Sequence, residues 1–364
     1  MKPILNFIVL FFVLSCYSQK NMDTIYGNPK SVRMKVELFG DLKSANVKIF
    51  ELEMQKSPQH ITSAFIGNWT RGLRASNINC YIAFLENGKK DYEIWYDNDN
   101  EIDTEYYYKY DKNENLIEAK ELIYDDVYYL TRYFYNKSNL LISESRYWSD
   151  DSNDFVHWYY TRGYKGKIIG VKSFDEYGSR DVITLEIDSL ENSIKEYHQR
   201  IFNYNNSNSV KIKDSIGNKF LIKKRMFDVF ENKIYEEHWI EENSKKPYKT
   251  IYRYDDRNNL IYQGNIEDSL TSYSRYRYNS NNLKTYYEHV NINHSNSNDT
   301  TVYRYNEYNL IKHVEYSGKD YYGRKRGHVL DFKYKFDRKG NWTKITKIVN
   351  GEPLYVWTRK IKYF

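Results

Sequence analysis

Cysteine is nearly absent from this chain, which has only Cys16 and Cys80 among its 364 residues. Cys16 lies in an N-terminal segment that we expect to be lipid-modified or removed. Cys80 would then have no partner, and no intramolecular disulfide could form. A protein of this size without disulfides has to be stabilised by its core and by its backbone hydrogen bonds.

The sequence also lacks the motifs of common catalytic and metal sites. It contains no HExxH pair, no G-x-S-x-G elbow and no phosphate-binding loop. The two nearest of its eight histidines, His289 and His294, fall in a polar segment. We therefore expect no metal, no cofactor and no enzymatic activity. A glycoside hydrolase is a third reading of the function, because carboxylates are abundant, but nothing singles out two of them.

One stretch, "DNDNEIDTEYYY", begins like a calcium-binding loop. Asp97, Asp99 and Glu101 supply oxygen atoms at the first positions of such a loop. The sixth position requires glycine and the twelfth requires glutamate, but Ile102 and Tyr108 stand there. A turn of the repeat described below accounts for the same residues.

The chain also has no large excess of positive or negative charge. The formal net charge is +6. Loss of the first 18 residues, whose one charged side chain is Lys2, would leave 6 − 1 = +5. Because acidic residues are interspersed throughout, we expect no nucleic-acid partner. The densest basic cluster, "GRKRG" at residues 323–327, predicts a solvated loop.

The first 18 residues are ordered like a secretory signal peptide. Lys2 precedes an apolar run from Ile4 to Leu14, which is too short to span a bilayer as a helix, and small residues follow. Two alternative cleavage sites fit this sequence. "VLSC" resembles a bacterial lipobox and would leave a lipid on Cys16, whereas "CYS" before Gln19 fits ordinary signal peptidase. We expect an exported protein: a lipoprotein at the outer membrane or periplasmic side that touches membrane only through Cys16, or a secreted protein.

Tyrosine is what the chain has in quantity, with 40 residues against 17 phenylalanines. A bias toward AT-rich codons would raise both residues, so the fold itself must favour the hydroxyl group. A half-exposed sheet does so if the ring packs on its neighbours while the hydroxyl reaches water.

The tyrosines occur in a phrase that is stated many times, as in "YRYDDRNNLIYQG" and "YRYNEYNLIKH". Neighbouring copies are spaced by about 25 residues, or about 14 in compressed stretches. A long set of turns has an aromatic residue or Ile, then Asp, and Asn four positions after the Asp: Tyr110-Asp111…Asn115, Ile187-Asp188…Asn192, Phe227-Asp228…Asn232, Tyr254-Asp255…Asn259 and Phe336-Asp337…Asn341. A short set begins with Asn instead: Tyr135-Asn136…Asn139, Tyr278-Asn279…Asn282 and Tyr305-Asn306…Asn309.

The segments before these turns alternate with a period of two. In "LDFKYKFD", Leu330, Phe332, Tyr334 and Phe336 share one face, and charged residues occupy the other. The following Asp or Asn is expected to accept backbone N–H groups within its own turn, with a tighter turn in the short set. The predicted fold class is all-β: an antiparallel meander of β-hairpin repeats that forms an extended or curled sheet.

We divide the chain into residues 1–18 as signal peptide, 19–91 as a cap of strands and loops, and 92–364 as the repeats. The alternation loses its phase between Ile187 and Phe230, which predicts a β-bulge or bend there.

The pattern Y-x-[YF]-D-x-x-G-N-[LW] resembles the YD repeat of the RHS family, the β-hairpin repeat of bacterial Rhs and insecticidal toxin-complex shells. "YKFDRKGNWTKI" is its closest copy, and "IYGNPKSV" and "TRKIKYF" resemble the short exported members of that family in Gram-negative bacteria. The resemblance covers about Tyr92 to Phe364 and implies the fold rather than an activity. The chain departs from the family by showing no toxin region or proteolytic core motif, so toxin delivery is not implied. Most copies also lack the usual glycine, which is replaced by Glu114, Glu191, Glu231 and Asn258.

Candidate binding residues are aromatic and basic. Tryptophan rings on an exposed sheet face can stack on sugars, although they can equally pack with the tyrosines. The candidates are Trp95, Trp148, Trp158 and Trp239, together with a row formed by Arg253, Arg277 and Arg304. We expect these arginines to line the wetter face, opposite Tyr252, Tyr254, Tyr276, Tyr278, Tyr303 and Tyr305.

The function expected from these features is binding or structural. The sequence favours a non-enzymatic cell-envelope or secreted repeat protein that binds a glycan or an envelope protein. An alternative is an immunity or accessory protein for a secreted toxin.

Overall fold

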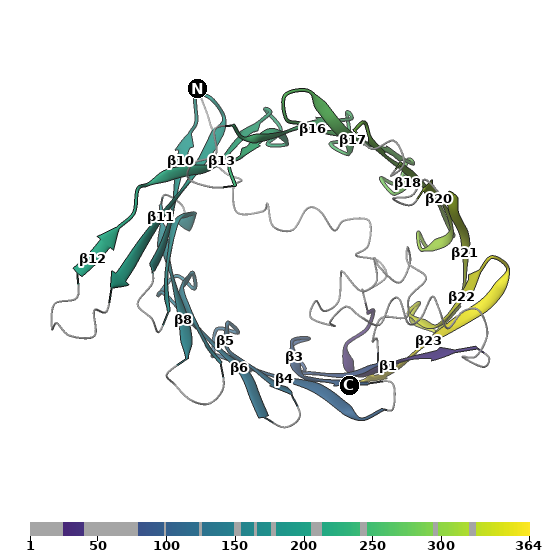
Figure 1. Cartoon of the computed structure of the whole chain (residues 1–364). Coiled ribbons are helices and arrows are strands. Elements are labelled where there is room, and N and C mark those ends of the chain that lie inside the picture. The colour runs from purple at the N-terminus through teal and green to yellow at the C-terminus, as the bar shows by residue number, and fades with distance from the viewer. Residues whose placement is uncertain are drawn as a thin grey trace. The chain divides into compact units, whose positions relative to one another are not determined.

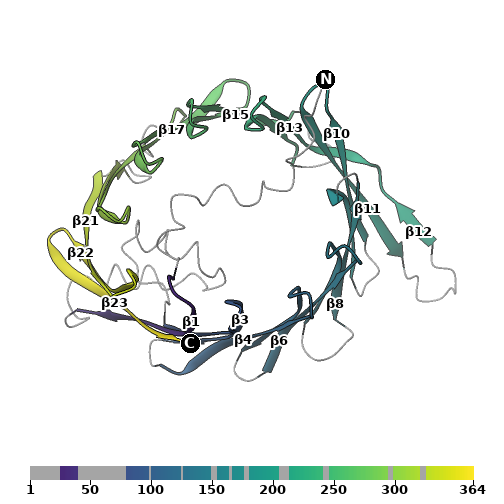
Figure 2. The same ribbon diagram turned by 180° about the vertical axis from the view of Figure 1, so that it is seen from behind.

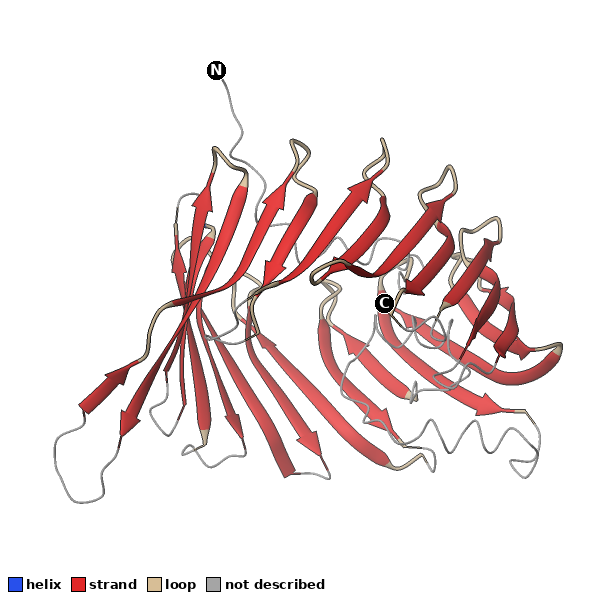
Figure 3. Ribbon diagram, turned by 45° about the horizontal axis from the view of Figure 1, so that its top comes forward, coloured by secondary structure: helices blue, strands red, loops and turns tan. Residues whose placement is uncertain are grey.

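The computed structural model describes residues 25–39, 79–97, 100–123, 126–148, 154–163, 166–175, 180–204, 213–240, 246–293, 298–319 and 325–364. These residues form 23 β-strands and no α-helix (Figure 3). No helix long and apolar enough to cross a membrane occurs in these ranges. Cys16 and the predicted signal peptide lie outside them, as do the first two residues of "GRKRG".

The strands belong to two compact units, and each is described by itself. The described part of unit 1 lies within Tyr106–Thr271, and that of unit 2 lies within Phe12–Glu105 and Ser272–Phe364. Two strands contain the boundaries: β4 (Ile102–Tyr110) and β17 (Leu270–Tyr278). Unit 1 holds β5 (Leu116–Ile123), β6 (Asp126–Tyr135), β7 (Leu141–Trp148), β8 (Phe155–Arg162), β9 (Ile168–Asp175), β10 (Arg180–Asp188), β11 (Ser193–Tyr204), β12 (Lys213–Ile216), β13 (Phe220–Phe227), β14 (Lys233–His238), β15 (Tyr248–Tyr254) and β16 (Leu260–Ile266). Unit 2 holds β1 (Pro29–Leu38), β2 (Cys80–Phe84), β3 (Lys90–Tyr96), β18 (Lys284–Asn291), β19 (Asp299–Tyr305), β20 (Ile311–Lys319), β21 (Lys325–Phe336), β22 (Trp342–Val349) and β23 (Glu352–Tyr363).

The prediction of an all-β antiparallel meander is confirmed in its strand direction, but an extended or curled sheet is wrong. β1 pairs with β2 on one side and with β23 on the other, and all described strands belong to one sheet. Figures 1 and 2 show β1 beside β23 from both sides. The first and last described strands therefore cover each other's edges, which is the pairing topology of a closed β-barrel rather than of a sheet with free ends.

All the repeat turns except the one at Asp188 share one five-residue geometry. Asp188 instead accepts the N–H groups of Leu190 and Glu191, and the left-handed residue of its turn is the fifth, Asn192 (φ 47°). In the turn that begins at Asp255, the backbone N–H of Asp255 donates to the carbonyl of Asn259 at 3.0 Å. The Asp255 Oδ1 accepts the N–H groups of Arg257 and Asn259 at 3.0 and 2.8 Å. Asp111, Asp228 and Asp337 accept the equivalent pairs of N–H groups, which confirms the predicted role of the aspartate.

The expected tighter turn of the short set is wrong. Asn136 Oδ1 accepts the N–H groups of Ser138 and Leu140, the same two positions as in the long set. Apart from the Asp188 turn, the left-handed residue is also the fourth of the loop in both sets, as with Asn139 (φ 57°) and Asn258 (φ 61°). The sets differ only in sequence, because the asparagine of the short set stands at the left-handed position itself.

Neighbouring turns are joined by asparagine side chains. The side-chain oxygen of a left-handed asparagine accepts an amide N–H from the preceding repeat turn, at 3.1 to 3.2 Å. The pairs are Asn113 and Asn115 with Asn139, Asn232 with Asn258, and Asn281 with Asn309. Asparagine therefore provides both the left-handed backbone and a link between repeats.

Two left-handed positions carry glutamate where the family pattern has glycine. Glu231 has a φ of 64°, whereas Gly340 occupies the matching position in the last copy. The left-handed conformation costs a residue with a side chain about 1–2 kcal/mol, which glycine would avoid. Glycine also gives the unfolded chain more conformational entropy, which offsets part of this stabilisation. Glu231→Gly should therefore stabilise the protein by about 0.5–1 kcal/mol. Urea denaturation would measure it. Glu307→Gly, at an exposed loop position outside the left-handed region, is the control and should not stabilise. A lower urea midpoint for Glu231→Gly would contradict the strain.

A β-bulge follows the turn in most copies. Arg253 pairs with Tyr262, but the next residue, Tyr254, pairs with Leu260, so Ile261 is left out of the register. The same one-residue shift occurs on β2–β3, β6–β7, β8–β9, β13–β14, β17–β18, β19–β20 and β21–β22. The bulge predicted between Ile187 and Phe230 is confirmed by a register shift between Glu196 and Tyr197.

The tyrosine that precedes a turn explains the excess over phenylalanine. The Tyr305 hydroxyl donates to the carbonyl of Lys284, the first residue of β18, at 2.7 Å. The expectation that these hydroxyls reach water is therefore wrong at such positions. Equivalent bonds to the first residue of a strand are Tyr135 to Leu116, Tyr254 to Lys233, and Tyr334 to Ile311. Two arginine side chains also donate to the carbonyl of the first residue of a strand: Arg162 to Leu141 and Arg359 to Trp342.

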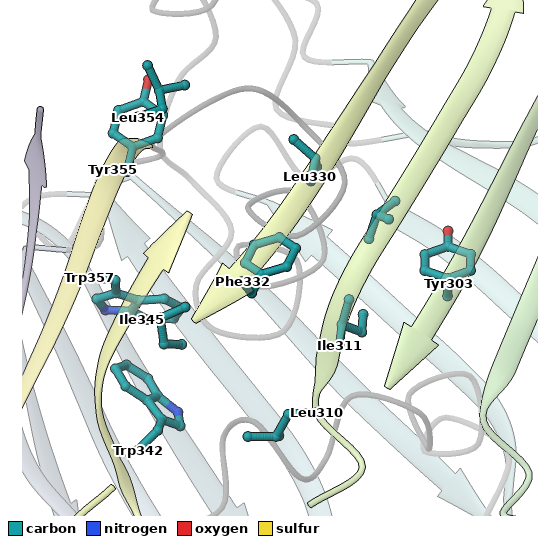
Figure 4. Close-up of a cluster of buried hydrophobic side chains, with 11 residues drawn as sticks. Tyr303, Leu310, Ile311, Leu330, Phe332, Trp342, Ile345, Leu354, Tyr355 and Trp357 are labelled. Carbon is teal, nitrogen blue, oxygen red and sulfur yellow. The ribbon is translucent and has the colours of Figure 1, made fainter. Parts of the chain in front are cut away.

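The core described in unit 2 lies along β19–β23 (Figure 4). Trp342 and Trp357 are 3% and 1% exposed, with ring centroids 4.6 Å apart. Leu330 and Phe332 are buried, and Tyr334 and Phe336 pack against the cluster, so the predicted shared face is confirmed. The remaining buried members are Tyr303, Leu310, Ile311, Val314, Ile345, Leu354 and Tyr355.

The tyrosines and the arginine of each repeated "YRY" phrase lie on opposite faces of the sheet, as expected. We call the face with Tyr303 and Tyr305 in unit 2, and with Tyr133 and Tyr135 in unit 1, the tyrosine face, and the other the arginine face. Tyr303 is 4% exposed, whereas Arg253, Arg277 and Arg304 are exposed. The arginines do not depend on acidic partners: Arg253 and Arg277 lie over the rings of Tyr262 and Tyr286, at 5.2 and 4.8 Å, and Arg304 lies opposite His313.

Candidate functional site

The tyrosine face of unit 1 carries charged and aromatic side chains between β5 and β8. The strand register places Glu121, Tyr129 and Trp148 directly opposite one another on β5, β6 and β7. Because side chains alternate along a strand, Arg146 and Glu144 share the face of Trp148. Glu144 in turn lies opposite Trp158 of β8. We call the six residues Glu121, Tyr129, Glu144, Arg146, Trp148 and Trp158 the Trp148–Trp158 cluster.

Arg146 lies between two of the aromatic rings. Its guanidinium carbon is 5.4 Å from the ring centre of Tyr129 and 5.7 Å from that of Trp158. The Tyr129 ring also meets Trp148 edge to face, with centroids 6.1 Å apart. Trp148 and Trp158 are half-buried and Arg146 is exposed, so the rings are held in place while part of the cluster is open to solvent.

The two carboxylates have different environments. The Tyr106 hydroxyl donates to Glu121 Oε1 at 3.0 Å. Burial raises the pKa of Glu121 above its ordinary value, although this hydrogen bond and the charge of Arg146 act in the opposite direction. At the other end of the cluster, burial first and then Glu144 raise the pKa of Tyr160. The Tyr160 hydroxyl therefore remains a neutral donor that can orient Glu144, as the Tyr106 hydroxyl orients Glu121 by its hydrogen bond.

This arrangement can bind a polyhydroxylated ring. Indole and phenol faces offer apolar contact, while the guanidinium and the carboxylates can donate to and accept from hydroxyl groups. In unit 2, the equivalent face is filled by the buried apolar cluster. The two described units thus use the same repeat geometry for a core in one and for an open aromatic and charged surface in the other.

The predicted site residues are distributed among different surroundings. Trp148 and Trp158 belong to one cluster, but Trp95 is 8% exposed within β3 and is not open for binding. Trp239 follows β14, is half-buried, and donates its backbone N–H to Ile222 at 2.9 Å. The structure describes no group of three or more His, Cys, Asp or Glu side chains that could hold a metal ion.

Sequence reasoning did not select Glu121, Tyr129, Glu144 or Arg146. The signal was available on β7, where Glu144, Arg146 and Trp148 follow each other at every second position and therefore share a face. Their assembly with Tyr129 and Trp158 depends on the register, which the bulge after each turn shifts by one residue.

No family model matches the chain, and no curated protein matches it. Among solved structures, it is similar to the TcdB2-TccC3-Cdc42 structure, at 12% identity and a TM-score of 0.40, over 80% of this chain and 17% of that chain. It is also similar to the Photorhabdus luminescens Tc holotoxin pore, at 8% identity and a TM-score of 0.28, over 84% and 20% of the two chains. A porin-like protein from Bacteroides uniformis is similar at 9% identity and a TM-score of 0.23, over 67% and 92%.

This chain therefore spans no more than a fifth of the length of these toxin chains. All three TM-scores are below 0.5, so these likenesses assign neither a family nor a function.

Proposed function

We propose that this protein is an exported, non-enzymatic carbohydrate-binding protein built from RHS-type repeats, and that the Trp148–Trp158 cluster is its binding site. The observation that carries the proposal is the position of Arg146 over Tyr129 and Trp158, with carboxylates at both ends of the cluster. Rings supported by neighbours and by a cation lose little entropy when a sugar stacks on them. Export from the cell rests on the order of residues 1–18.

The spacing of the carboxylates favours binding over glycoside hydrolysis. Glu121 and Glu144 lie two strands apart, and Glu144 is four residues along β7 from the position opposite Glu121. With strands about 4.8 Å apart and a rise of about 3.4 Å per residue, their Cα atoms are about 17 Å apart. Hydrolysis requires the carboxyl groups themselves to lie about 5–9.5 Å apart. Glutamates at this Cα spacing reach that range only if both side chains extend toward each other across Arg146. Arg146 stands between them, where a scissile bond would have to lie.

A glycan array followed by titration calorimetry with the best ligand tests this proposal. Arg146→Ala and Trp158→Ala should each weaken binding at least about tenfold, because each removes a stacking partner or a charge-assisted hydrogen bond. The matched controls are Arg253→Ala, an exposed arginine that also lies over a tyrosine, and Trp239→Ala; both should bind as the parent does.

Equal melting temperatures for Arg146→Ala and the parent would show that the variant is folded. The proposal fails if no glycan binds, or if the controls lose as much affinity as the cluster variants.

A further inference from the structure

The arginine face of β21, β22, β23 and β1 in unit 2 carries a concentration of lysines. These four strands are consecutive neighbours, and β22, β23 and β1 lie together in both views of the molecule (Figures 1 and 2). Phe332, Ile345 and Trp357 point into the core. Because side chains alternate, Lys333 and Lys344 point to the opposite face.

The strand register places like charges directly opposite each other on this face. Lys335 of β21 pairs with Lys344 of β22, and Lys360 of β23 pairs with Arg33 of β1. Like charges at such positions destabilise a sheet, so these pairs are not explained by stability. We call the following residues the lysine patch: Arg33, Lys35, Lys333, Lys335, Lys344, Lys360 and Lys362.

Few acidic groups neutralise the patch. Lys35 pairs with Glu37 at 2.9 Å, and Arg33 lies over the Tyr96 ring at 4.2 Å. The other five lysines have no ion pair with any carboxylate in the described ranges, and Lys333, Lys335, Lys360 and Lys362 are exposed. The patch is therefore a strong local concentration of positive charge on a chain of modest net charge.

We propose that the lysine patch binds the surface of a membrane that contains anionic phospholipids. Lysine is a flexible point charge, which suits attraction to many mobile headgroups, whereas directed recognition of one phosphate or carboxylate favours arginine. The positions between the lysines are occupied by Thr346, Thr358 and Ser31, so no aromatic ring lies among the lysines to stack on a sugar or a nucleobase. The ring of Tyr96 contacts only Arg33 of the patch.

Two features at the edge of the patch agree with a membrane partner. Phe364, two residues after Lys362, is 50% exposed, and an exposed aromatic ring beside lysines is typical of interfacial anchoring. β1 begins at Pro29, thirteen residues after Cys16. A lipid on Cys16 would therefore keep β1 within about 45 Å of the bilayer. A single lipid signal holds a protein weakly, and a basic patch is a common second signal.

Vesicle co-sedimentation tests the proposal with the chain from Gln19 to Phe364, which contains every described residue and no lipidation site. The vesicles are phosphatidylcholine alone or with about 30% phosphatidylglycerol, at about 50 mM and about 500 mM salt. We expect binding only to the anionic vesicles and at low salt. The triple variant Lys335→Gln, Lys344→Gln, Lys360→Gln should bind about a hundredfold more weakly.

The matched control removes the same number of charges from exposed lysines elsewhere: Lys112→Gln, Lys137→Gln, Lys172→Gln. It should bind as the parent does, and the patch variant should melt no lower than the parent, because it relieves both like-charge pairs, Lys335–Lys344 and Lys360–Arg33. The proposal is overturned if the parent ignores anionic vesicles or if both triple variants lose binding equally. It is also overturned if soluble polyanions, such as a polyuronate or an oligonucleotide, bind the patch as tightly as the vesicles do. None of these results depends on glycan binding in unit 1.

Discussion

Replacing Trp357 with alanine should lower the free energy of unfolding by about 3–5 kcal/mol, the range observed for large aromatic side chains removed from a core. Trp357 is 1% exposed and its ring packs against Trp342 at a centroid distance of 4.6 Å. Trp342 in turn lies under the guanidinium of Arg359, at 3.9 Å. The cavity would therefore open beside a buried cation, which adds to the cost because water and charge would enter the core.

Urea denaturation of the full chain, followed by far-ultraviolet circular dichroism, would measure this loss. Trp239→Ala is the control, since Trp239 is half-buried outside the core cluster and should cost far less. A loss below about 1 kcal/mol for Trp357→Ala would mean that the β19–β23 cluster does not stabilise the protein.

Tyr305→Phe removes only one oxygen atom, yet it should cost about 1–3 kcal/mol. The hydroxyl donates to the Lys284 carbonyl at 2.7 Å, and burial raises the pKa of Tyr305 well above its ordinary value. Phenylalanine would keep the ring contacts but leave a carbonyl at the start of β18 without this donor. Since the same bond recurs at Tyr135, Tyr254 and Tyr334, this one measurement tests the reason for the tyrosine excess.

The control is Tyr308→Phe. Tyr308 also carries a ring contact, with Phe336 at 4.6 Å, but it is 54% exposed. We expect its stability to change by less than about 0.5 kcal/mol, as for most surface substitutions. Equal losses for the two tyrosines would show that the inter-repeat hydrogen bond has no special weight.

Local features of this fold could be predicted from the sequence. The period-two pattern of Leu330 to Phe336 identified a strand and its buried face, and the Asp-to-Asn spacing identified the turns. These features are set by residues close together in the chain, so their physical chemistry is visible in a short window. The prediction of two different turn geometries was wrong. Apart from the Asp188 turn, the loops of both sets have the same backbone, and that backbone accepts asparagine at either the fourth or the fifth residue of the loop.

Features that depend on distant residues could not be predicted in the same way. The closure of the sheet depends on β1 pairing with β23. The alternating pattern of "SVRMKVEL" predicts a strand but does not indicate which strand it pairs with. The Trp148–Trp158 cluster depends on bulges that shift the register after each turn, so Arg146 could not be placed beside Tyr129 and Trp158 from alternation alone. Two of the four candidate tryptophans proved to belong to the cluster, and their neighbours emerged only from the pairing.

The pairing of β1 with β23 also has a consequence for how the chain is made. Nearly every other strand pair joins neighbours in sequence and can form as a hairpin while synthesis proceeds. The bond from Thr358 to Lys35 spans 323 residues. One edge of β1 must therefore wait until almost all of the repeats have emerged. During that interval it is an open template for strands of other molecules, and the time needed to make the rest of the chain sets the exposure to aggregation.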